Sequence, residues 1–302
     1  MVDGPVLRDR GDRAGAPGRA RHLAEVRQPS FRPAYRALGA LAYEGARVSV
    51  AVVDIATGDS VFAVDERIVL PTASIGKILL LIEVSARLTE RTVSDYSIAD
   101  RTAHDAVADS GLWQHLQAPA FPIADLAALV GATSDNLATN VLLRQVGLDA
   151  VRSRTEKLGL VRTALLDRVR DVRGPDDAPQ LSVGSAAELA WLFHALANGH
   201  IIDPQTSQRV LSWLSLNADL SMVASAFGRD PLAHRGVEHN TWMVNKTGTD
   251  VGVRSEAGIL RGPRAGLAYA VSVHFDDTDL PRRLRVLDAL RVLGLDLLEF
   301  VH

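Results

Sequence analysis

Lysine is scarce in this chain of 302 residues, and its placement points to chemistry. Lysine and arginine together number 33, and only three of them are lysine. Two of the three lie in short motifs, Ser74-Ile-Gly-Lys77 and Lys246-Thr-Gly248. Arginine would serve equally well as a surface charge, but only an ammonium group has a pKa that can fall far enough for it to act as a base. The motif lysines therefore predict proton transfer, whereas Lys157 is expected on a solvated helix face.

Ser74 precedes Lys77 by three residues. If Ser74 opens a helix, both side chains project from one face within hydrogen-bond range, so the hydroxyl has a base beside it. The positive end of the helix dipole would also favour a developing alkoxide. A lone serine before an apolar run is more often a helix N-cap, but two further motifs favour the chemical interpretation. They are Ser134-Asp-Asn136 and the Lys-Thr-Gly triplet.

The three motifs occur in the order that active-site serine penicillin-recognising enzymes use. From about Phe31 to the C-terminus the chain resembles the class A β-lactamase and penicillin-binding-protein superfamily, and Leu166-Asp-Arg168 is similar to the start of that family's Ω-loop. The resemblance implies a serine hydrolase that forms an acyl-enzyme on Ser74 with β-lactam, amide or ester substrates. It also implies a substrate that carries a carboxylate and an acyl group.

The resemblance assigns a role to each motif residue. Besides Ser74 and Lys77, Ser134 would pass a proton to the leaving group, and Lys246 would hold the substrate carboxylate and support the proton relay. The N–H groups of Ser74 and Thr249 would form the oxyanion hole. The expected catalytic set is Ser74, Lys77, Ser134 and Lys246, and the expected substrate-binding set is Asn136 for the acyl amide, Thr247 for the carboxylate, Gly248 to leave room for the substrate, Thr249 and Arg254.

For Arg254 and for Trp113 the sequence leaves two roles open, and for Asp135 and the histidines it favours structural roles. Arg254 is expected either to assist carboxylate binding or to be a surface charge, and Trp113 to form either a rim of the cleft or part of the core. Asp135 is expected to anchor its loop. No histidine pair has metal-ligand spacing, so no metal or other cofactor is predicted, and the histidines singled out are taken as structural or surface residues. They are His194, His234 and His274.

The chain departs from the family where the Ω-loop glutamate is expected. That glutamate activates the water that hydrolyses the acyl-enzyme, but here the loop is shorter and reads Val169-Arg170. Acylation is expected to survive this change, and deacylation of a β-lactam to be slow. The residues that would have to supply a base instead are Asp171, Asp176, Asp177 and Lys77. A structural salt bridge of Arg168 with Asp176 or Asp177 is the favoured role of those acids.

Three functions follow from these expectations. The first is a serine hydrolase that deacylates without the glutamate, slow or atypical as a β-lactamase. The second is a biosynthetic acyltransferase, in which another nucleophile takes the acyl group. The third is a β-lactam-binding protein that is acylated and does not turn over.

Composition limits the classes of molecule that the protein could bind and the kinds of site that it could contain. The formal net charge of −3 and the pI near 6.3 give no basic field for nucleic acid. The absence of cysteine excludes disulfides, thiol nucleophiles and zinc–thiolate sites. Residues 1–30 are rich in arginine and lack an apolar core, so no secretory signal and no membrane association are expected. A cytoplasmic location is therefore predicted, with an exported parent form not excluded, and the oligomeric state is left open.

The patterns predict an α/β protein, more narrowly α+β. An antiparallel sheet built from the N- and C-terminal segments is flanked by helices, and the cleft lies between it and an all-helical lobe. Residues 1–30 are a polar extension, and 31–302 form one β-lactamase-like domain with an α/β lobe (31–70 and 234–302) and a helical lobe (71–233). The predicted strands are 47–54, 60–64, 241–246, 254–260 and 267–275, and the predicted helices are 74–88, 123–130, 136–146, 185–197, 205–226 and 280–301.

Overall fold

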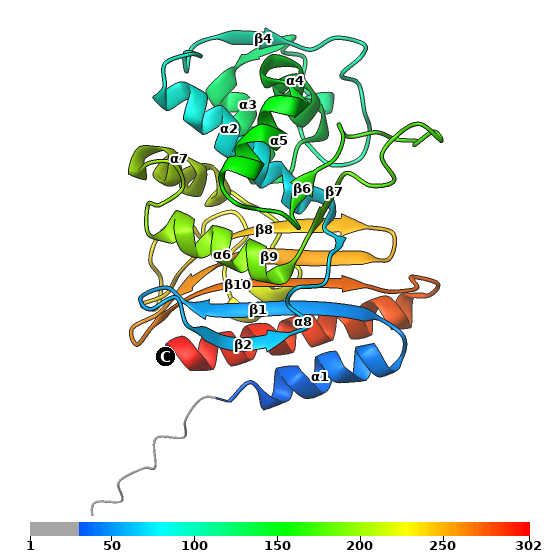
Figure 1. The fold of residues 1–302 in the computed structure, drawn as a ribbon, viewed down its shortest axis with the longest axis vertical. Helices are drawn as coiled ribbons and strands as arrows, with labels where there is room; N and C mark the ends of the chain where they lie inside the picture. Colours follow the sequence, from blue (N-terminus) through cyan, green and yellow to red (C-terminus); the bar gives the residue numbers. More distant parts are fainter. Residues whose placement is uncertain (1–29) are drawn as a thin grey trace, which may run out of the picture.

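The computed structural model describes residues 30–302, so the polar extension lies almost entirely outside the described residues. Its centre is a five-stranded antiparallel sheet in the order β2-β1-β10-β9-β8 (Figure 1). As predicted, the N- and C-terminal segments share this sheet. The strands are β1 (Arg47–Asp54), β2 (Ser60–Val64), β8 (Trp242–Asp250), β9 (Val253–Arg261) and β10 (Gly266–His274).

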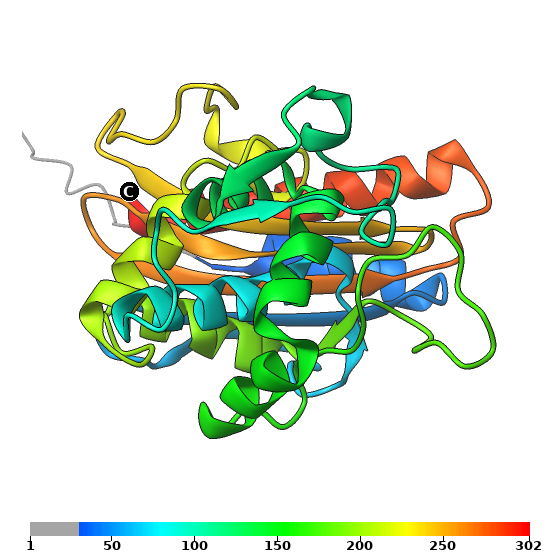
Figure 2. The same ribbon diagram turned by 90° about the horizontal axis from the view of Figure 1, so that it is seen from above.

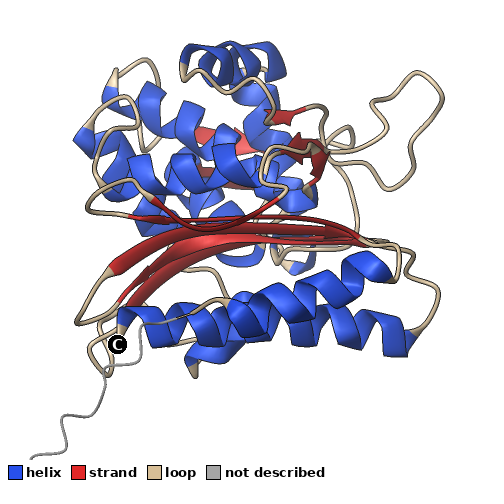
Figure 3. Cartoon of the chain, turned by 60° about the horizontal axis from the view of Figure 1, so that its bottom comes forward, coloured by secondary structure: helices blue, strands red, loops and turns tan. Residues whose placement is uncertain are grey.

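Helices cover both faces of the sheet (Figure 3). One face packs on α1 (Arg32–Tyr43), α8 (Leu280–Val301) and the short 3-10 helix η3 (Val223–Phe227), and the other on α6 (Ala186–Ala197). Successive side chains of a strand point to opposite faces of the sheet. Val50 and Val52 of β1 therefore belong to the core between the sheet and α8, and Ala51 belongs to the core on the α6 side. Both α6 and η3 belong to the range predicted for the helical lobe, although they pack on the sheet or on α8.

The remaining helices form a separate layer above α6 (Figures 1 and 2). At its centre lies α2, which is buried along nearly its whole length and continues after Lys77 with the unbroken apolar run 78–82. The helices of this layer are α2 (Lys77–Thr89), α3 (Ile123–Thr133), α4 (Asn136–Val146), α5 (Leu148–Lys157) and α7 (Pro204–Leu214). The short elements are β3 (Leu70–Pro71), η1 (Ala73–Gly76), β4 (Ile98–Asp100), η2 (Trp113–His115), β5 (Ala120–Pro122), β6 (Ala164–Leu165) and β7 (Ser182–Gly184).

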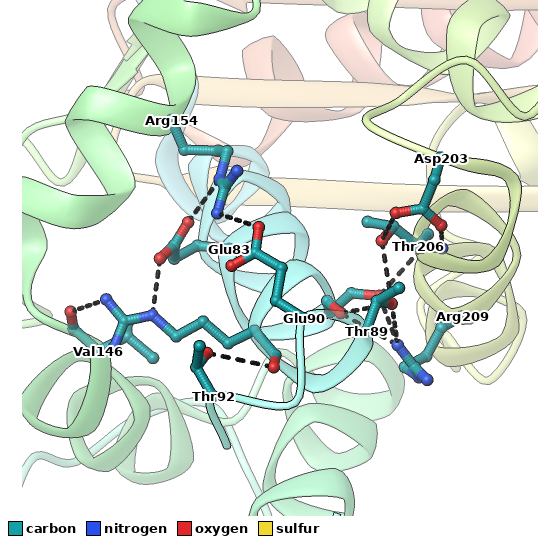
Figure 4. A network of polar contacts seen from close by, with 11 residues as sticks. Glu83, Thr89, Glu90, Thr92, Val146, Arg154, Asp203, Thr206 and Arg209 are labelled. Carbon is teal, nitrogen blue, oxygen red and sulfur yellow. Dashed lines mark hydrogen bonds and ion pairs between the residues drawn. The ribbon is translucent and has the colours of Figure 1, made fainter. Parts of the chain in front are cut away.

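A polar network fixes the far end of α2 (Figure 4). The buried Glu83 accepts from Arg87 on the same helix at 2.7 Å and from Arg154 of α5 at 2.8 Å. Arg87 also donates to the carbonyl of Val146 at the end of α4, and Arg154 to Glu90. A buried carboxylate is tolerated when it is paired and hydrogen-bonded in this way. The network therefore holds α2, which begins at Lys77, against two neighbouring helices.

One predicted helix is wrong. The range 205–226 is not continuous, because α7 ends at Leu214 and η3 begins only at Val223. Between them Asn217 donates from its side chain to the carbonyl of Asp219, and Asp219 accepts the N–H of Ser221. Asparagine, aspartate and serine side chains offer the backbone such alternatives to helical bonds. The resulting loop borders the candidate site.

Candidate active site

Ser74 lies in η1, the tight turn between β3 and α2. The preceding residue, Ala73, has a φ of +46°, a conformation that costs energy for any residue with a side chain. The turn packs directly on β8 at Gly248, where a Cβ atom would overlap the carbonyl oxygen of Thr72. Gly248 was predicted to leave room for the substrate. The structure shows that the side of Gly248 where a Cβ would lie faces the turn carrying Ser74, and room for the substrate at Gly248 stays a prediction.

The junction of α3 and α4 carries the second motif. Ser134 ends α3 with a φ of +55°, and Asp135 caps α4 by accepting the N–H of Ala138 at 2.9 Å. The Asp135 carboxylate also accepts the N–H groups of Leu112 and Trp113, both at 2.8 Å. The prediction that Asp135 anchors its loop is confirmed.

Trp113 belongs to the core. Its ring is fully buried, its Nε1 donates to the carbonyl of Ala118 at 2.9 Å, and Phe121 packs edge-on at 5.3 Å between ring centroids. The alternative that Trp113 forms a rim of the cleft is therefore wrong.

Lys77 is fully buried and points to the α3–α4 junction. Its Nζ donates to the Ser134 carbonyl at 2.6 Å and to Asn136 Oδ1 at 2.7 Å, and lies 3.2 Å from Ser134 Oγ. Within residues 30–302 none of its hydrogen bonds goes to Ser74, so the direct Ser74–Lys77 bond predicted from the spacing is not formed. The two short bonds to oxygen acceptors hold the amine towards Ser134 instead.

The charge state of Lys77 follows from its surroundings. Burial, together with the nearby charge of Lys246, holds the pKa of Lys77 well below its ordinary value. A neutral amine has two hydrogens and one lone pair. In its neutral form the Lys77 amine would give its two hydrogens to the Ser134 carbonyl and Asn136, and its lone pair would be free to accept a hydroxyl proton.

Lys246 approaches Ser134 from the opposite side. From β8 its Nζ donates to Ser134 Oγ at 3.1 Å and to the carbonyl of Thr247 at 2.7 Å. Burial lowers the pKa of Lys246 to about 8, against an opposing contribution from Asp219. Lys246 therefore stays mainly protonated at neutral pH, and the Ser134 hydroxyl lies between a charged lysine and the depressed-pKa amine of Lys77.

A cavity of about 390 Å³ opens beside these groups. It brings Ser74, Ser134, Thr247 and Thr249 together, while Lys77, Lys246 and Asn136 are buried close to it. Its lining is Ser74, Ser110, Ala132, Thr133, Ser134, Asn217, Ala218, Asp219, Thr247 and Thr249.

Sequence reasoning missed part of this lining. Asn217 and Asp219 were placed inside a predicted helix, and Ser110 was not assigned a role. The signal that could have found the loop is the pair Asn217 and Asp219 between Leu216 and Leu220, since both residues favour turns over a helix interior.

Arg254 is neither exposed nor directed to the cavity lining. Its Nη1 donates to the carbonyls of Asp250 and Val253, both at 2.8 Å, and the guanidinium lies 3.7 Å from Asp277 and 5.9 Å from the ring centre of Phe275. The surface-charge alternative is wrong, because the residue is buried. The guanidinium ties the β8–β9 hairpin to the segment after β10, and carboxylate binding by Arg254 stays a prediction.

The loop after β6 is tied together differently from what was predicted. Asp167 accepts from Arg170 and from Arg173, both at 2.7 Å, and Arg170 also pairs with Asp177 at 2.9 Å. These hydrogen bonds outweigh burial and hold the pKa of Asp167 below its usual range. The predicted salt bridge of Arg168 with Asp176 or Asp177 is wrong, because Arg168 donates to the carbonyl of His104 instead.

The three loop acids considered as bases are directed elsewhere. Asp177 is paired with Arg170 and accepts the N–H of Gly174, and Asp176 is exposed. Asp171 accepts the N–H of Ala108 at 2.9 Å. None of the three is among the residues that line the cavity in the described part of the chain, whose lining includes one acid, Asp219.

Comparisons with known proteins show the family of the chain. A model of the family described as "Beta-lactamase enzyme family" matches residues 32–301. The chain belongs to this family. No curated protein matches the chain.

Several solved structures share the fold of this chain. A β-lactamase from Sphaerobacter thermophilus superposes with a TM-score of 0.77 at 22% identity, covering 89% of this chain and 96% of that one. A structure of PBP-A gives 0.74 at 18% identity, with coverages of 88% and 94%. A class A β-lactamase variant of the last common ancestor of Gram-negative bacteria gives 0.73 at 23% identity, with coverages of 89% and 98%.

Proposed function

We propose that this member of the β-lactamase family is a serine hydrolase that forms an acyl-enzyme on Ser74. The observation that carries the proposal is the position of the Ser134 hydroxyl, which lies between Lys77 and Lys246 and lines one cavity with Ser74. An amine of lowered pKa that can act as a base and a protonated lysine, on either side of one hydroxyl, form a path for a proton.

The proposed reaction follows from these contacts. Ser74 Oγ attacks the acyl carbon, and its proton passes to Lys77, either through Ser134 or after the Ser74 hydroxyl turns towards the amine. Ser134 then returns a proton to the leaving nitrogen or oxygen. The N–H groups of Ser74 and Thr249 stabilise the oxyanion, a contribution of about 3 kcal/mol per donor. Lys246 and Thr247 hold the carboxylate of the substrate.

Acylation is proposed to be faster than deacylation. A variant of the structurally similar PBP-A was solved as an acyl-enzyme complex with penicillin G, which makes a penicillin a suitable first probe. In the present chain the loop position expected to hold the water-activating acid carries Arg170, which is engaged by Asp167 and Asp177. This observation favours slow turnover, and as a second function a β-lactam-binding protein that stays acylated, over rapid hydrolysis. The acyltransferase alternative would require an acceptor-dependent product.

Intact-mass spectrometry after mixing with penicillin G tests the proposal. We expect one adduct that persists for minutes, and no adduct with Ser74→Ala. Ser110→Ala is the matched control, because Ser110 lines the same cavity and should leave labelling intact. Labelling of Ser74→Ala, or its loss in Ser110→Ala alone, would refute the assignment.

A further inference from the structure

Glu256 is a buried acid beneath the candidate site. It lies on β9 directly across from Thr247 of the Lys-Thr-Gly motif and has no exposed surface. Within residues 30–302 it forms no salt bridge with a lysine, arginine or histidine. An unpaired buried carboxylate is costly, so its retention calls for an explanation in terms of what it holds.

Glu256 accepts hydrogen bonds from three different elements. Its Oε2 accepts the N–H of Val223 at 2.8 Å, at the start of η3. Its Oε1 accepts the N–H of Ala224 at 3.2 Å, the side-chain amide of Asn245 on β8 at 3.0 Å, and the hydroxyl of Tyr269 on β10 at 2.7 Å. The carboxylate therefore joins η3 to the strand that carries Lys246.

The bonds continue to the wall of the cavity. Asn245 accepts from Asn217 at 2.8 Å and donates to the carbonyl of Asp219 at 3.3 Å. Asn217 and Asp219 both line the cavity beside Ser74. Glu256 thus fixes the loop 217–224 at one end through η3 and at the other through Asn245.

We propose that Glu256 is a positioning residue, which holds the loop 217–224 against β8 and thereby sets the distance across the substrate cavity. The expected effect of Glu256 on the acylation rate rests on the proposed acylation of Ser74. The expected effect of Glu256 on the position of the loop does not. The loop itself can be followed independently of that chemistry.

The charge of Glu256 couples this role to pH. The groups that face it are Tyr269 from β10, Asn245 from β8, the two N–H groups of η3, and, at longer range, the acid Asp219. Burial raises the pKa of Glu256 to about 7, although the bonds from Tyr269 and Asn245 oppose the rise. All its partners donate, so they fit the ionised form, and a proton on the carboxylate displaces one of them. The loop is therefore held less firmly below pH 7.

Two measurements on Glu256→Gln test the proposal. Amide hydrogen exchange should become faster in residues 217–224, and acylation by penicillin G should fall on the order of tenfold, because a small displacement at a site is costly. Asp296→Asn is the matched control. Asp296 is also a buried acid that accepts a backbone N–H, but its partner is Ala34 of α1, far from the cavity.

The outcomes separate this proposal from the function on which it rests. Unchanged exchange in folded Glu256→Gln overturns the positioning role, whether or not Ser74 is acylated. Faster exchange with unchanged acylation overturns the effect on the site. If wild-type protein forms no Ser74 adduct, the proposed function fails while the exchange measurement still decides whether Glu256 holds the loop.

Tyr269→Phe provides a second test should Glu256→Gln fail to fold. It removes one bond that lowers the pKa of Glu256, so the pH midpoint at which exchange in 217–224 slows should move upward. An unmoved midpoint overturns the coupling between Glu256 and the loop.

Discussion

At the scale of single residues, the two motif lysines differ in the work their surroundings permit. Lys77 is buried beside a second cation and has two oxygen acceptors for its hydrogens, which suits a base. Lys246 keeps a pKa of about 8 and donates to Ser134 and to the strand itself, which suits a cation that holds an anion. The two positions require lysine for different reasons. The same substitution should therefore affect the reaction differently at each position.

Lys77→Arg and Lys246→Arg test this difference. Because a guanidinium does not lose its proton in proteins, Lys77→Arg removes the base and should lower the acylation rate by roughly 10²–10⁴-fold. Lys246→Arg keeps the charge and should mainly weaken substrate capture. Stopped-flow acylation at several penicillin concentrations separates the rate constant from the affinity. Equal and mild effects of both substitutions would contradict the assigned roles.

The burial of Lys246 also predicts how stability depends on pH. Its pKa is about 8 in the folded protein and near 10.5 when unfolded, so between these values the unfolded chain binds more protons. Stability should therefore rise from about pH 8 to about pH 10.5, with a contribution from Lys246 of about 2 to 3 kcal/mol.

Urea unfolding at pH 7.5 and pH 10 measures this contribution. Lys246→Met keeps the volume and removes the charge, so its gain between the two pH values should be smaller than that of the wild type. Equal gains would show that Lys246 has an ordinary pKa in the folded protein.

At the scale of elements, the approach of η1 to β8 depends on one glycine. Gly248→Ala puts a methyl group on the carbonyl of Thr72, which is backbone and cannot swing aside. We expect a loss of stability of a few kcal/mol and a displaced Ser74, with acylation reduced at least tenfold. Gly39→Ala on α1 is the control, since no atom lies within 4 Å of the new methyl group and alanine favours helices. Thermal unfolding and penicillin labelling of both variants decide the matter, and a stable, active Gly248→Ala protein would rule out the packing argument.

The loop after β6 gives a prediction about turnover. Arg170→Glu places a third carboxylate beside Asp167 and Asp177 and removes the cation that joins them. The loop should open, so steady-state nitrocefin hydrolysis should remain well below the ordinary enzyme turnover of about 10 per second. Arg170→Gln removes the cation without adding an acid and serves as the control. Rapid turnover by Arg170→Glu, but not by Arg170→Gln, would show that the loop can place a carboxylate beside the water that hydrolyses the acyl-enzyme.

The elements predicted from the sequence are those with a strong local pattern. The strands 47–54 and 60–64 and the helices 136–146 and 280–301 have the predicted ends, because an alternating or helical apolar pattern stops at clear polar boundaries. The sequence predicted a solvated helix face at Lys157 but no bounds for α5, which buries only Val151 and Thr155, and it did not predict α1. α5 has no continuous apolar stripe to mark its ends, whereas α1 has one in Ala34, Leu38 and Leu41 that the prediction did not use.

The candidate site was predictable where motifs mark it and not where tertiary structure creates it. Ser74, Ser134 and Thr247 meet in one cavity as the motifs imply. The bonds of Lys77 were not predictable from spacing, because they depend on the carbonyl of Ser134, which comes from another helix junction. Glu256 gave no signal, since only the strand register places it opposite the motif.

At the scale of the whole molecule, the site lies where two bodies of structure meet. The sheet supplies Lys246 to Thr249, the helical layer supplies Ser134, and η1 between them supplies Ser74. No helix within residues 30–302 combines the length and apolarity needed to cross a membrane. The cytoplasmic location and the division into lobes at residues 70 and 234 stay predictions.

The scarcity of lysine has a practical consequence for handling the protein. Of its three lysines, Lys77 and Lys246 have no exposed surface, and Lys157 at the end of α5 is exposed. Bulky amine-directed reagents, such as dye or biotin esters, therefore have one side-chain target, which belongs to a helix that contributes no residue to the lining of the cavity. Attachment through Lys157 would leave the cavity free to meet a penicillin from solution.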